Sequence, residues 1–155
     1  MMLKKIIKEN GATSDKLIPI LLEYQKKKGK NYITDDEMAI IAKELNIPQT
    51  RVSSVAEFYT LISTKPRGRF IIQVCEDVPC YINGSTDVVL ELEKQLNIKM
   101  GETTSDLMFT LEHTSCIGCC DKSPAMRVGD EVYGNLTSEK IARILLEYRR
   151  SEDEQ

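Results

Sequence analysis

The stretch RFIIQVC, residues 69–75, is a run of β-branched and aromatic residues that ends on a cysteine. This composition is typical of a buried β-strand, and the run follows a break in the pattern at Lys65-Pro66-Arg67-Gly68. A second candidate strand, FTLEHT at 109–114, comes just before Cys116. Both strands therefore deliver cysteines at their ends, and thiols on neighbouring loops at one sheet edge can converge on a single centre.

Over residues 67–155, the sequence pattern predicts the element order β-α-β-β-β-α. A βαβ unit followed by a hairpin and a final helix is the arrangement of a thioredoxin-like half-open sandwich. The predicted elements besides the two strands are a helix opening at residues 84–87, a hairpin that turns at Gly129-Asp130, and a last helix from about Thr137.

The pattern of residues 1–66 predicts only helices. Each of them is short, so each must bury its apolar stripe against the others. Thr34 and Glu37 are spaced as a capping box, and Pro48 fits the first turn of a third helix. We expect Phe58 and Tyr59 in the core of this bundle, and the basic run at 26–30 as a solvated helix end. The predicted fold is α+β, with a small helical bundle at 1–66 and a thioredoxin-like domain at 67–155.

The net charge and the length of the apolar runs argue against several classes of protein. The formal net charge is -3, which gives no indication of a nucleic-acid binder. Neither the N-terminus nor any other stretch has an apolar run typical of a signal peptide or of a membrane span, so we expect a cytoplasmic protein without membrane insertion. Because thiols stay reduced in that compartment, clustered cysteines are expected to be metal ligands or catalytic groups.

The spacing of the five cysteines leaves several occupants open. Cys75 and Cys80 form C-x4-C, whereas Cys116, Cys119 and Cys120 contain both C-x2-C and C-x3-C. Zinc knuckles fit if Cys119 is used, and a redox dithiol fits Cys116 with Cys119, although the following residues favour a loop over an activating helix. A 2Fe-2S cluster held by four thiolates tolerates the less regular spacings. Cysteines that serve only as small buried side chains are a further alternative.

A resemblance decides between these alternatives. The chain resembles the thioredoxin-like 2Fe-2S subunit of NADH dehydrogenases, and is similar to the small subunits of NAD(P)-linked or electron-bifurcating hydrogenases and of NAD-dependent formate dehydrogenases. The resemblance covers nearly the whole chain. The residues that carry it are Phe58-Tyr59-Thr60, Ile72-Gln73-Val74-Cys75, Cys80-Tyr81, Gly84-Ser85, Cys116-Ile117-Gly118-Cys119-Cys120, Ser123-Pro124-Ala125-Met126 and Tyr133-Gly134-Asn135-Leu136-Thr137.

The resemblance implies a 2Fe-2S cluster with Cys75 and Cys80 on one iron and Cys116 and Cys120 on the other. Cys119 stands where the family usually has a small residue, often alanine, and is expected to be a small buried side chain. We expect Gly118 to let backbone N–H groups approach the sulfurs.

The resemblance also implies one-electron transfer with a flavin-bearing NAD(P)H-binding subunit, alongside further iron-sulfur subunits. The chain contains no G-x-G-x-x-G fingerprint, so it has no visible nucleotide motif and no catalytic site of its own is expected. A zinc-stabilised interaction domain and a thiol-disulfide oxidoreductase are the alternative functions. Which parent complex the subunit serves is left open by the sequence.

Overall fold

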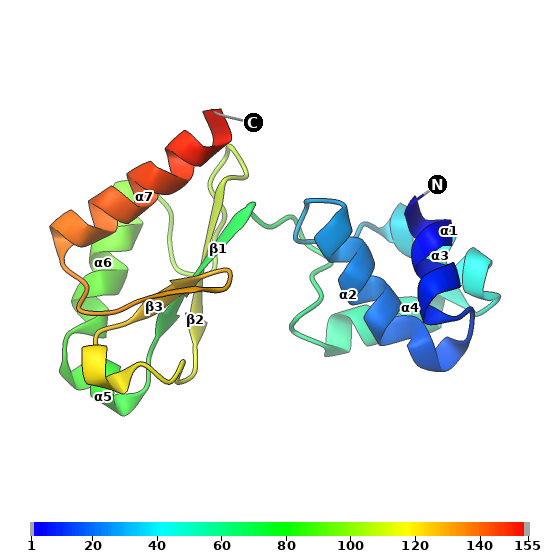
Figure 1. Cartoon of the computed structure of the whole chain (residues 1–155), viewed down its shortest axis with the longest axis horizontal. Coiled ribbons are helices and arrows are strands. Elements are labelled where there is room, and N and C mark those ends of the chain that lie inside the picture. The colour runs from blue at the N-terminus through cyan, green and yellow to red at the C-terminus, as the bar shows by residue number, and fades with distance from the viewer. Residues whose placement is uncertain (1, 154–155) are drawn as a thin grey trace. The chain divides into compact units, whose positions relative to one another are not determined.

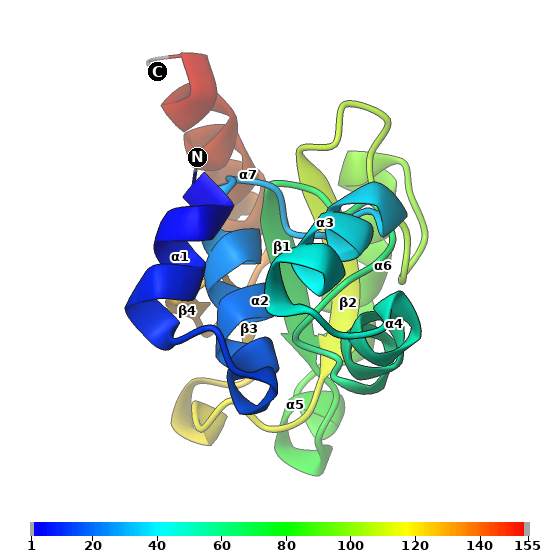
Figure 2. The same ribbon diagram turned by 90° about the vertical axis from the view of Figure 1, so that its right-hand side faces the viewer.

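The computed structural model describes residues 2–153, and the chain divides after Arg69 into two compact units (Figure 1). The N-terminal unit is helical throughout, as predicted. In Figure 2, α1 lies against α2 and α3 lies against α4. Its helices are α1 (Met2–Asn10), a 3-10 turn η1 (Ser14–Lys16), α2 (Leu17–Lys27), α3 (Asp35–Leu45) and α4 (Gln49–Phe58).

The start of α3 confirms the predicted capping box. The Thr34 side chain accepts a hydrogen bond from the Glu37 backbone N–H, and the Glu37 carboxylate accepts one from the Thr34 N–H. Pro48 is the N-cap of α4 and so lies just before its first turn rather than within it. The core of the unit is aliphatic, with fully buried side chains from every helix, among them Ile6, Ile20, Leu21, Met38, Ile41 and Val52.

The prediction that Phe58 and Tyr59 belong to the bundle core is wrong. Phe58 is 77% exposed and Tyr59 is 39% exposed. Helix α4 turns Val52 and Ala56 inward, one turn apart, and Phe58 lies on the opposite face at the helix end. Tyr59 follows the helix with extended backbone, so the helical register no longer determines where its ring points.

The basic run at 26–30 is also not uniformly solvated. The Lys28 side chain is only 9% exposed, and its Nζ pairs with Glu37 Oε2 and lies 4.8 Å from the centroid of the Tyr32 ring. Tyr24 donates its hydroxyl to the other oxygen of Glu37, at 3.1 Å. The same carboxylate caps α3, so Lys28 ties the end of α2 to the start of α3.

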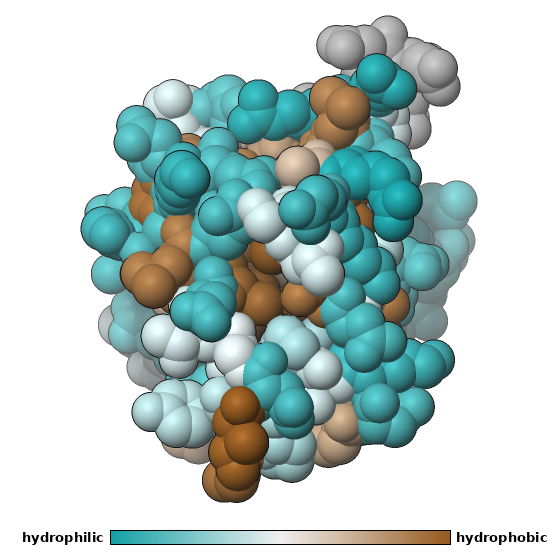
Figure 3. Space-filling model, turned by 90° about the vertical axis from the view of Figure 1, so that its left-hand side faces the viewer, coloured by the Kyte–Doolittle hydropathy of each residue, from teal (hydrophilic) through white to brown (hydrophobic). Residues whose placement is uncertain are grey.

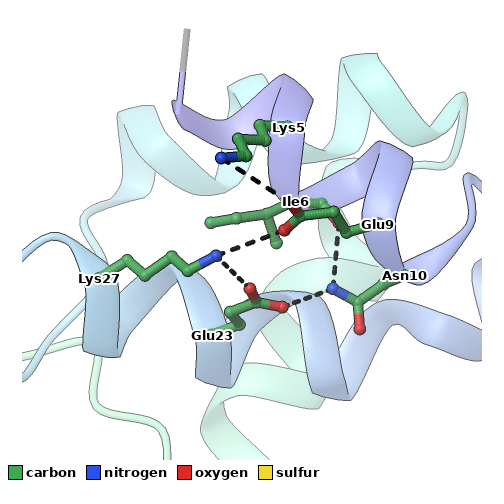
Figure 4. A network of polar contacts seen from close by, with 6 residues as sticks. All are labelled: Lys5, Ile6, Glu9, Asn10, Glu23 and Lys27. Carbon is green, nitrogen blue, oxygen red and sulfur yellow. Dashed lines mark hydrogen bonds and ion pairs between the residues drawn. The ribbon is translucent and has the colours of Figure 1, made fainter.

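Lys27 belongs to a more exposed network between α1 and α2 (Figure 4). Its Nζ lies 2.5 Å from Glu23 Oε1 and 3.4 Å from Glu9 Oε2. Asn10 donates to Glu23 Oε2 at 2.5 Å and to the Ile6 carbonyl at 3.0 Å. Exposed ion pairs of this kind contribute little, so the network positions α1 more than it stabilises the unit.

Replacing Lys28 by alanine is therefore expected to destabilise the chain by about 1–3 kcal/mol, because Glu37 loses its positively charged partner in a half-buried setting. Replacing Lys27 by alanine is the matched control, and its effect on stability should be much smaller, because water screens the exposed ion pairs of Lys27. Urea denaturation of both variants at neutral pH measures the difference. Equal losses for the two lysines would contradict the assigned role of Lys28.

The same pair predicts a pH dependence. Burial raises the pKa of Glu37, but hydrogen bonds from Lys28 and the Thr34 N–H, with the Lys28 charge, lower it more, and the net value lies below the ordinary 4.5. A depressed carboxyl pKa contributes stability above the unfolded-state pKa, which is lost as pH falls through the folded pKa. Wild-type stability should drop below about pH 4.5, and Lys28→Ala should show a smaller drop in the same urea series.

The C-terminal unit has a four-stranded mixed sheet in the order β2-β1-β3-β4. Strand β1 pairs parallel to β2 and antiparallel to β3, and β3 pairs antiparallel to β4. This is the predicted thioredoxin-like arrangement. Its elements are β1 (Phe70–Cys75), α5 (Val78–Ile82), α6 (Ser85–Leu96), β2 (Phe109–Thr114), a 3-10 turn η2 (Cys120–Lys122), β3 (Met126–Val128), β4 (Glu131–Tyr133) and α7 (Ser138–Asp153).

Helices α6 and α7 lie on the same face of this sheet (Figure 1). The core between them and the strands includes Ile72, Leu92, Phe109, Met126 and Ile141, all at most 1% exposed. The alternate side chains of the strands form a polar row on the other face. There Arg127 Nε donates to Gln73 Oε1 at 2.6 Å, and Gln73 Nε2 donates to Glu112 Oε2 at 3.2 Å. The sandwich is therefore half open, with one apolar and one polar face.

Helix α5 is the α-helix of this unit that the sequence did not predict, and the 3-10 turn η2 lies where a loop was expected. It has five residues, with proline in its first turn, and it carries Cys80. No helix among the described residues is both long and apolar enough to cross a membrane.

Candidate metal centre

The cysteines gather where β1 and β2 end. Cys75 is the last residue of β1, and it lies opposite Thr114, the last residue of β2. Because parallel strands finish at the same edge of a sheet, the loop after β2 brings Cys116 to the level of Cys75. Cys80 follows on α5, and Cys120 opens the 3-10 turn η2.

Within this group the thiols lie in two pairs. The sulfurs of Cys116 and Cys120 are 3.4 Å apart, and Cys75 and Cys80 pack together with Ala125 in a small buried cluster. The pairs are close enough for charge to couple them, since Cys120 acts on the pKa of Cys80 and Cys75 acts on that of Cys120. Cys75 and Cys80 are buried, whereas Cys116 and Cys120 are exposed.

The electrostatics of the site keep the thiols of Cys80 and Cys120 protonated as long as no metal binds them. Burial, followed by the neighbouring Cys75, raises the pKa of Cys80 to about 11, while the Ala125 backbone acts in the opposite direction. The hydrogen bond with Cys116 is the main cause that raises the pKa of Cys120. Thiolates packed this closely oppose one another's ionisation, and a metal that ligates them supplies the compensating positive charge.

The two pairs fit a binuclear iron centre, in which each iron takes two thiolates. A structural zinc ion instead needs all four sulfurs around one point. In residues 2–153, no three Cys, His, Asp or Glu side chains are grouped so as to hold a single ion. The structure assembles two pairs of thiols, Cys75 with Cys80 in a small buried cluster and Cys116 with Cys120 at 3.4 Å between their sulfurs.

Gly118 takes the part expected from the sequence. Its φ of +78° lies in the left-handed region that favours glycine, and its N–H donates to Cys116 Sγ at 3.4 Å. Backbone N–H groups that point at a ligating sulfur stabilise negative charge there and raise the reduction potential of a cluster.

Cys119 is half-buried, and it packs with Ile117 against Cys75, Cys80 and Ala125. It thus has the surroundings of a small packing residue, although it lies beside the candidate ligands.

Two further residues support the site, and nothing in the sequence pattern pointed to their contacts. Asn83 Nδ2 donates to the Pro79 carbonyl at 2.7 Å and to Ser123 Oγ at 2.9 Å. It thereby links the end of α5, which carries Cys80, to the segment that follows Cys120. Gly134 lies so close to the 3-10 turn η2 that a Cβ added there would meet Lys122 and Cys119. Both contacts join segments that are distant in the sequence, which local patterns do not reveal.

A half-open thioredoxin-like sandwich with two pairs of thiols at one sheet edge fits an iron-sulfur electron carrier of ferredoxin type. A sequence model of the thioredoxin-like [2Fe-2S] ferredoxin family matches residues 3–149. The chain belongs to this family, whose cofactor is the 2Fe-2S cluster expected from the sequence.

The chain also matches curated relatives along most of their length. The chain is 41% identical over 121 residues to the NADH-quinone oxidoreductase subunit designated E in Pseudomonas aeruginosa, covering 78% of this chain and 73% of that one. It is 42% identical over 122 residues to the same subunit of Escherichia coli strain K12, covering 79% and 74%. The corresponding subunit of Rhizobium meliloti, designated E 2, is 37% identical over 136 residues, covering 88% and 80%.

The solved structure of an NAD+-reducing [NiFe]-hydrogenase in the air-oxidised state contains the same fold. It superposes with a TM-score of 0.65 at 20% identity, over 75% of this chain. The chain spans about a fifth of that hydrogenase chain, since the match covers 20% of it.

Proposed function

We propose that this chain transfers single electrons through a 2Fe-2S cluster, as a subunit of an NAD(P)H-linked oxidoreductase. The observation that carries the proposal is the convergence of two thiol pairs at one sheet edge, in a member of the 2Fe-2S ferredoxin family. The proposed ligands are Cys75 and Cys80 for one iron and Cys116 and Cys120 for the other.

The cluster supplies the one-electron chemistry when bound, and the protein holds, insulates and tunes it. Cys75 and Cys80 lie at 1% and 2% exposure, so this side is shielded from water. Cys116 and Cys120 are exposed, which opens the other side to an approaching partner. The Gly118 N–H stabilises negative charge on Cys116.

The proposed partner is a flavin-bearing, NAD(P)H-binding subunit. Helix α5 turns Cys80 inward and exposes Val78, Tyr81 and Ile82, at 67%, 66% and 74%. In Figure 3 the face of the C-terminal unit is largely hydrophilic, with a hydrophobic protrusion at its lower end, the end at which Figure 1 places α5. Exposed apolar side chains next to a redox site are suited to contact another protein. Phe58 and Leu61 offer a comparable surface on the N-terminal unit.

A redox titration of anaerobically purified protein tests the electron-transfer function. A 2Fe-2S centre should titrate as a one-electron couple, with about one unpaired spin per chain appearing on reduction. A thiol-disulfide oxidoreductase would show a two-electron couple and no paramagnetic signal. NADH alone should leave the centre oxidised, whereas NADH with a flavin-bearing NADH-oxidising subunit should reduce it.

A further inference from the structure

The turn that carries Cys120 has little structure of its own. It is three residues long, and its internal backbone hydrogen bonds are those of the Lys122 N–H to the Cys119 carbonyl at 3.1 Å and of the Ser123 N–H to the Cys120 carbonyl at 3.4 Å. Cys120 itself is exposed. The 3.4 Å approach of its sulfur to Cys116 must therefore be fixed by contacts from outside the turn.

Those contacts come from residues 134–136, the strap, which joins β4 to α7. The Asn135 N–H donates to the Lys122 carbonyl at 2.5 Å, and the Leu136 N–H donates to the Pro124 carbonyl at 3.3 Å. Lys140 Nζ donates to the Gly134 carbonyl at 2.5 Å, which ties the strap to α7. Leu136 is 7% exposed and belongs to the core of the unit. The strap is thus fixed by the core and by α7, and it is hydrogen-bonded to the segment that carries Cys120.

Gly134 makes the close approach possible because it has no side chain. A Cβ at this position would lie 2.5 Å from Lys122 Cβ, 2.6 Å from the Lys122 carbonyl oxygen and 3.3 Å from Cys119 Sγ. The two contacts with Lys122 are shorter than the distances between packed atoms in proteins. One of them is to the backbone carbonyl oxygen, which cannot rotate away as a side chain can. At six other glycines of the chain, an added Cβ would meet no atom closer than 3.5 Å.

We propose that Gly134 is a positioning residue for the cluster: by admitting the strap against the η2 turn, it sets Cys120, rather than the adjacent Cys119, beside Cys116. The inference rests on the proposed function. Crowding at Gly134 should push the turn outward and separate Cys120 from Cys116, while the buried pair Cys75 and Cys80 stays in place.

The test compares Gly134→Ala with Gly101→Ala after anaerobic cluster reconstitution. Gly101 has a φ of +88° and no atom within 4 Å of an added Cβ, so its alanine variant strains the backbone without touching the site. For Gly134→Ala we expect the cluster to be lost to a chelator about tenfold faster than in wild type, with shifted g-values in the reduced protein. For Gly101→Ala we expect wild-type values of both. Adding Lys122→Gly to Gly134→Ala removes one of the two short contacts and should restore part of the chelator resistance.

Lys140→Ala provides a second test that does not depend on the alanine variant at 134 folding. It loosens the strap without crowding it, and should speed chelator loss by a smaller factor than Gly134→Ala. Wild-type chelator rates and g-values in Gly134→Ala, or in Lys140→Ala if Gly134→Ala does not fold, overturn the inference. A wild-type protein that takes up no iron-sulfur cluster overturns the proposed function instead, so the two failures are distinguishable.

Discussion

Cys120→Ala is expected to abolish or remodel the iron-sulfur centre, whereas Cys119→Ala is expected to leave it intact. Cys120 lies 3.4 Å from the sulfur of Cys116 and couples electrostatically to Cys75 and Cys80. Cys119 instead packs as a half-buried side chain beside Ala125. Alanine lacks only the sulfur atom, and Cys119 is half-buried, so the Cys119 variant removes a thiol with a small change in packing.

The measurement is the visible absorbance and the iron content of each variant after anaerobic purification. If Cys119 takes over as a ligand when Cys120 is missing, Cys120→Ala keeps some colour with an altered EPR signal. In that case the double variant Cys119→Ala/Cys120→Ala should lose both the colour and the EPR signal. Loss of the centre in Cys119→Ala, with retention of a wild-type signal in Cys120→Ala, would show that the assigned ligand set is wrong.

The second large effect concerns the sheet that carries the cysteines. Phe109 opens β2, is fully buried, and lies 5.9 Å from the Phe70 ring between centroids. Phe109→Ala removes a whole ring from a packed core, and the expected loss is about 3–5 kcal/mol. That is a large part of the roughly 5–15 kcal/mol that stabilises an ordinary domain. Because β2 leads into Cys116, the variant should also bind its cluster poorly.

Phe58→Ala is the matched control for this substitution. It deletes the same ring at a site that is 77% exposed, and its effect should stay within about 0.5 kcal/mol. Urea denaturation followed by far-UV circular dichroism suits both variants, because the chain has no tryptophan. A destabilisation by Phe58→Ala as large as that by Phe109→Ala would mean that the exposed ring is in fact part of a core.

The strands and the cysteine-bearing loops could be predicted because their signals are local. Strand β1 ends on Cys75 and β2 ends two residues before Cys116, and β-branched content identifies both strands without knowledge of the rest of the chain. Their parallel pairing follows from the intervening helix, as the chain must cross over to return in the same direction. The candidate ligands were chosen through the resemblance, since spacing alone left zinc and a dithiol open.

Helix α5 was missed for a different reason. Five residues are too few to show a helical period, and Pro79 suggests a turn as readily as the start of a helix. The consequence for the site is specific, because the helix buries Cys80 on one side and exposes Tyr81 on the other. A loop at this place would determine neither the burial of Cys80 nor the exposure of Tyr81.

Lys28 and Gly134 show what tertiary contacts add. A lysine in a basic run is usually solvated, and only the fold of the chain between the end of α2 and the start of α3 brings Glu37 within reach of Lys28. Likewise, the need for glycine at 134 arises from Lys122, on a turn that precedes the β3–β4 hairpin, and the backbone conformation at Gly134 itself does not demand it. Neither requirement has a local sequence signal.

The most direct test of the central claim is the iron and acid-labile sulfide content of the wild-type protein purified without oxygen. Four thiolates in two pairs predict about two irons and two sulfides per chain, a brown colour, and a rhombic EPR signal on reduction. A colourless protein that contains zinc and no iron would contradict the claim.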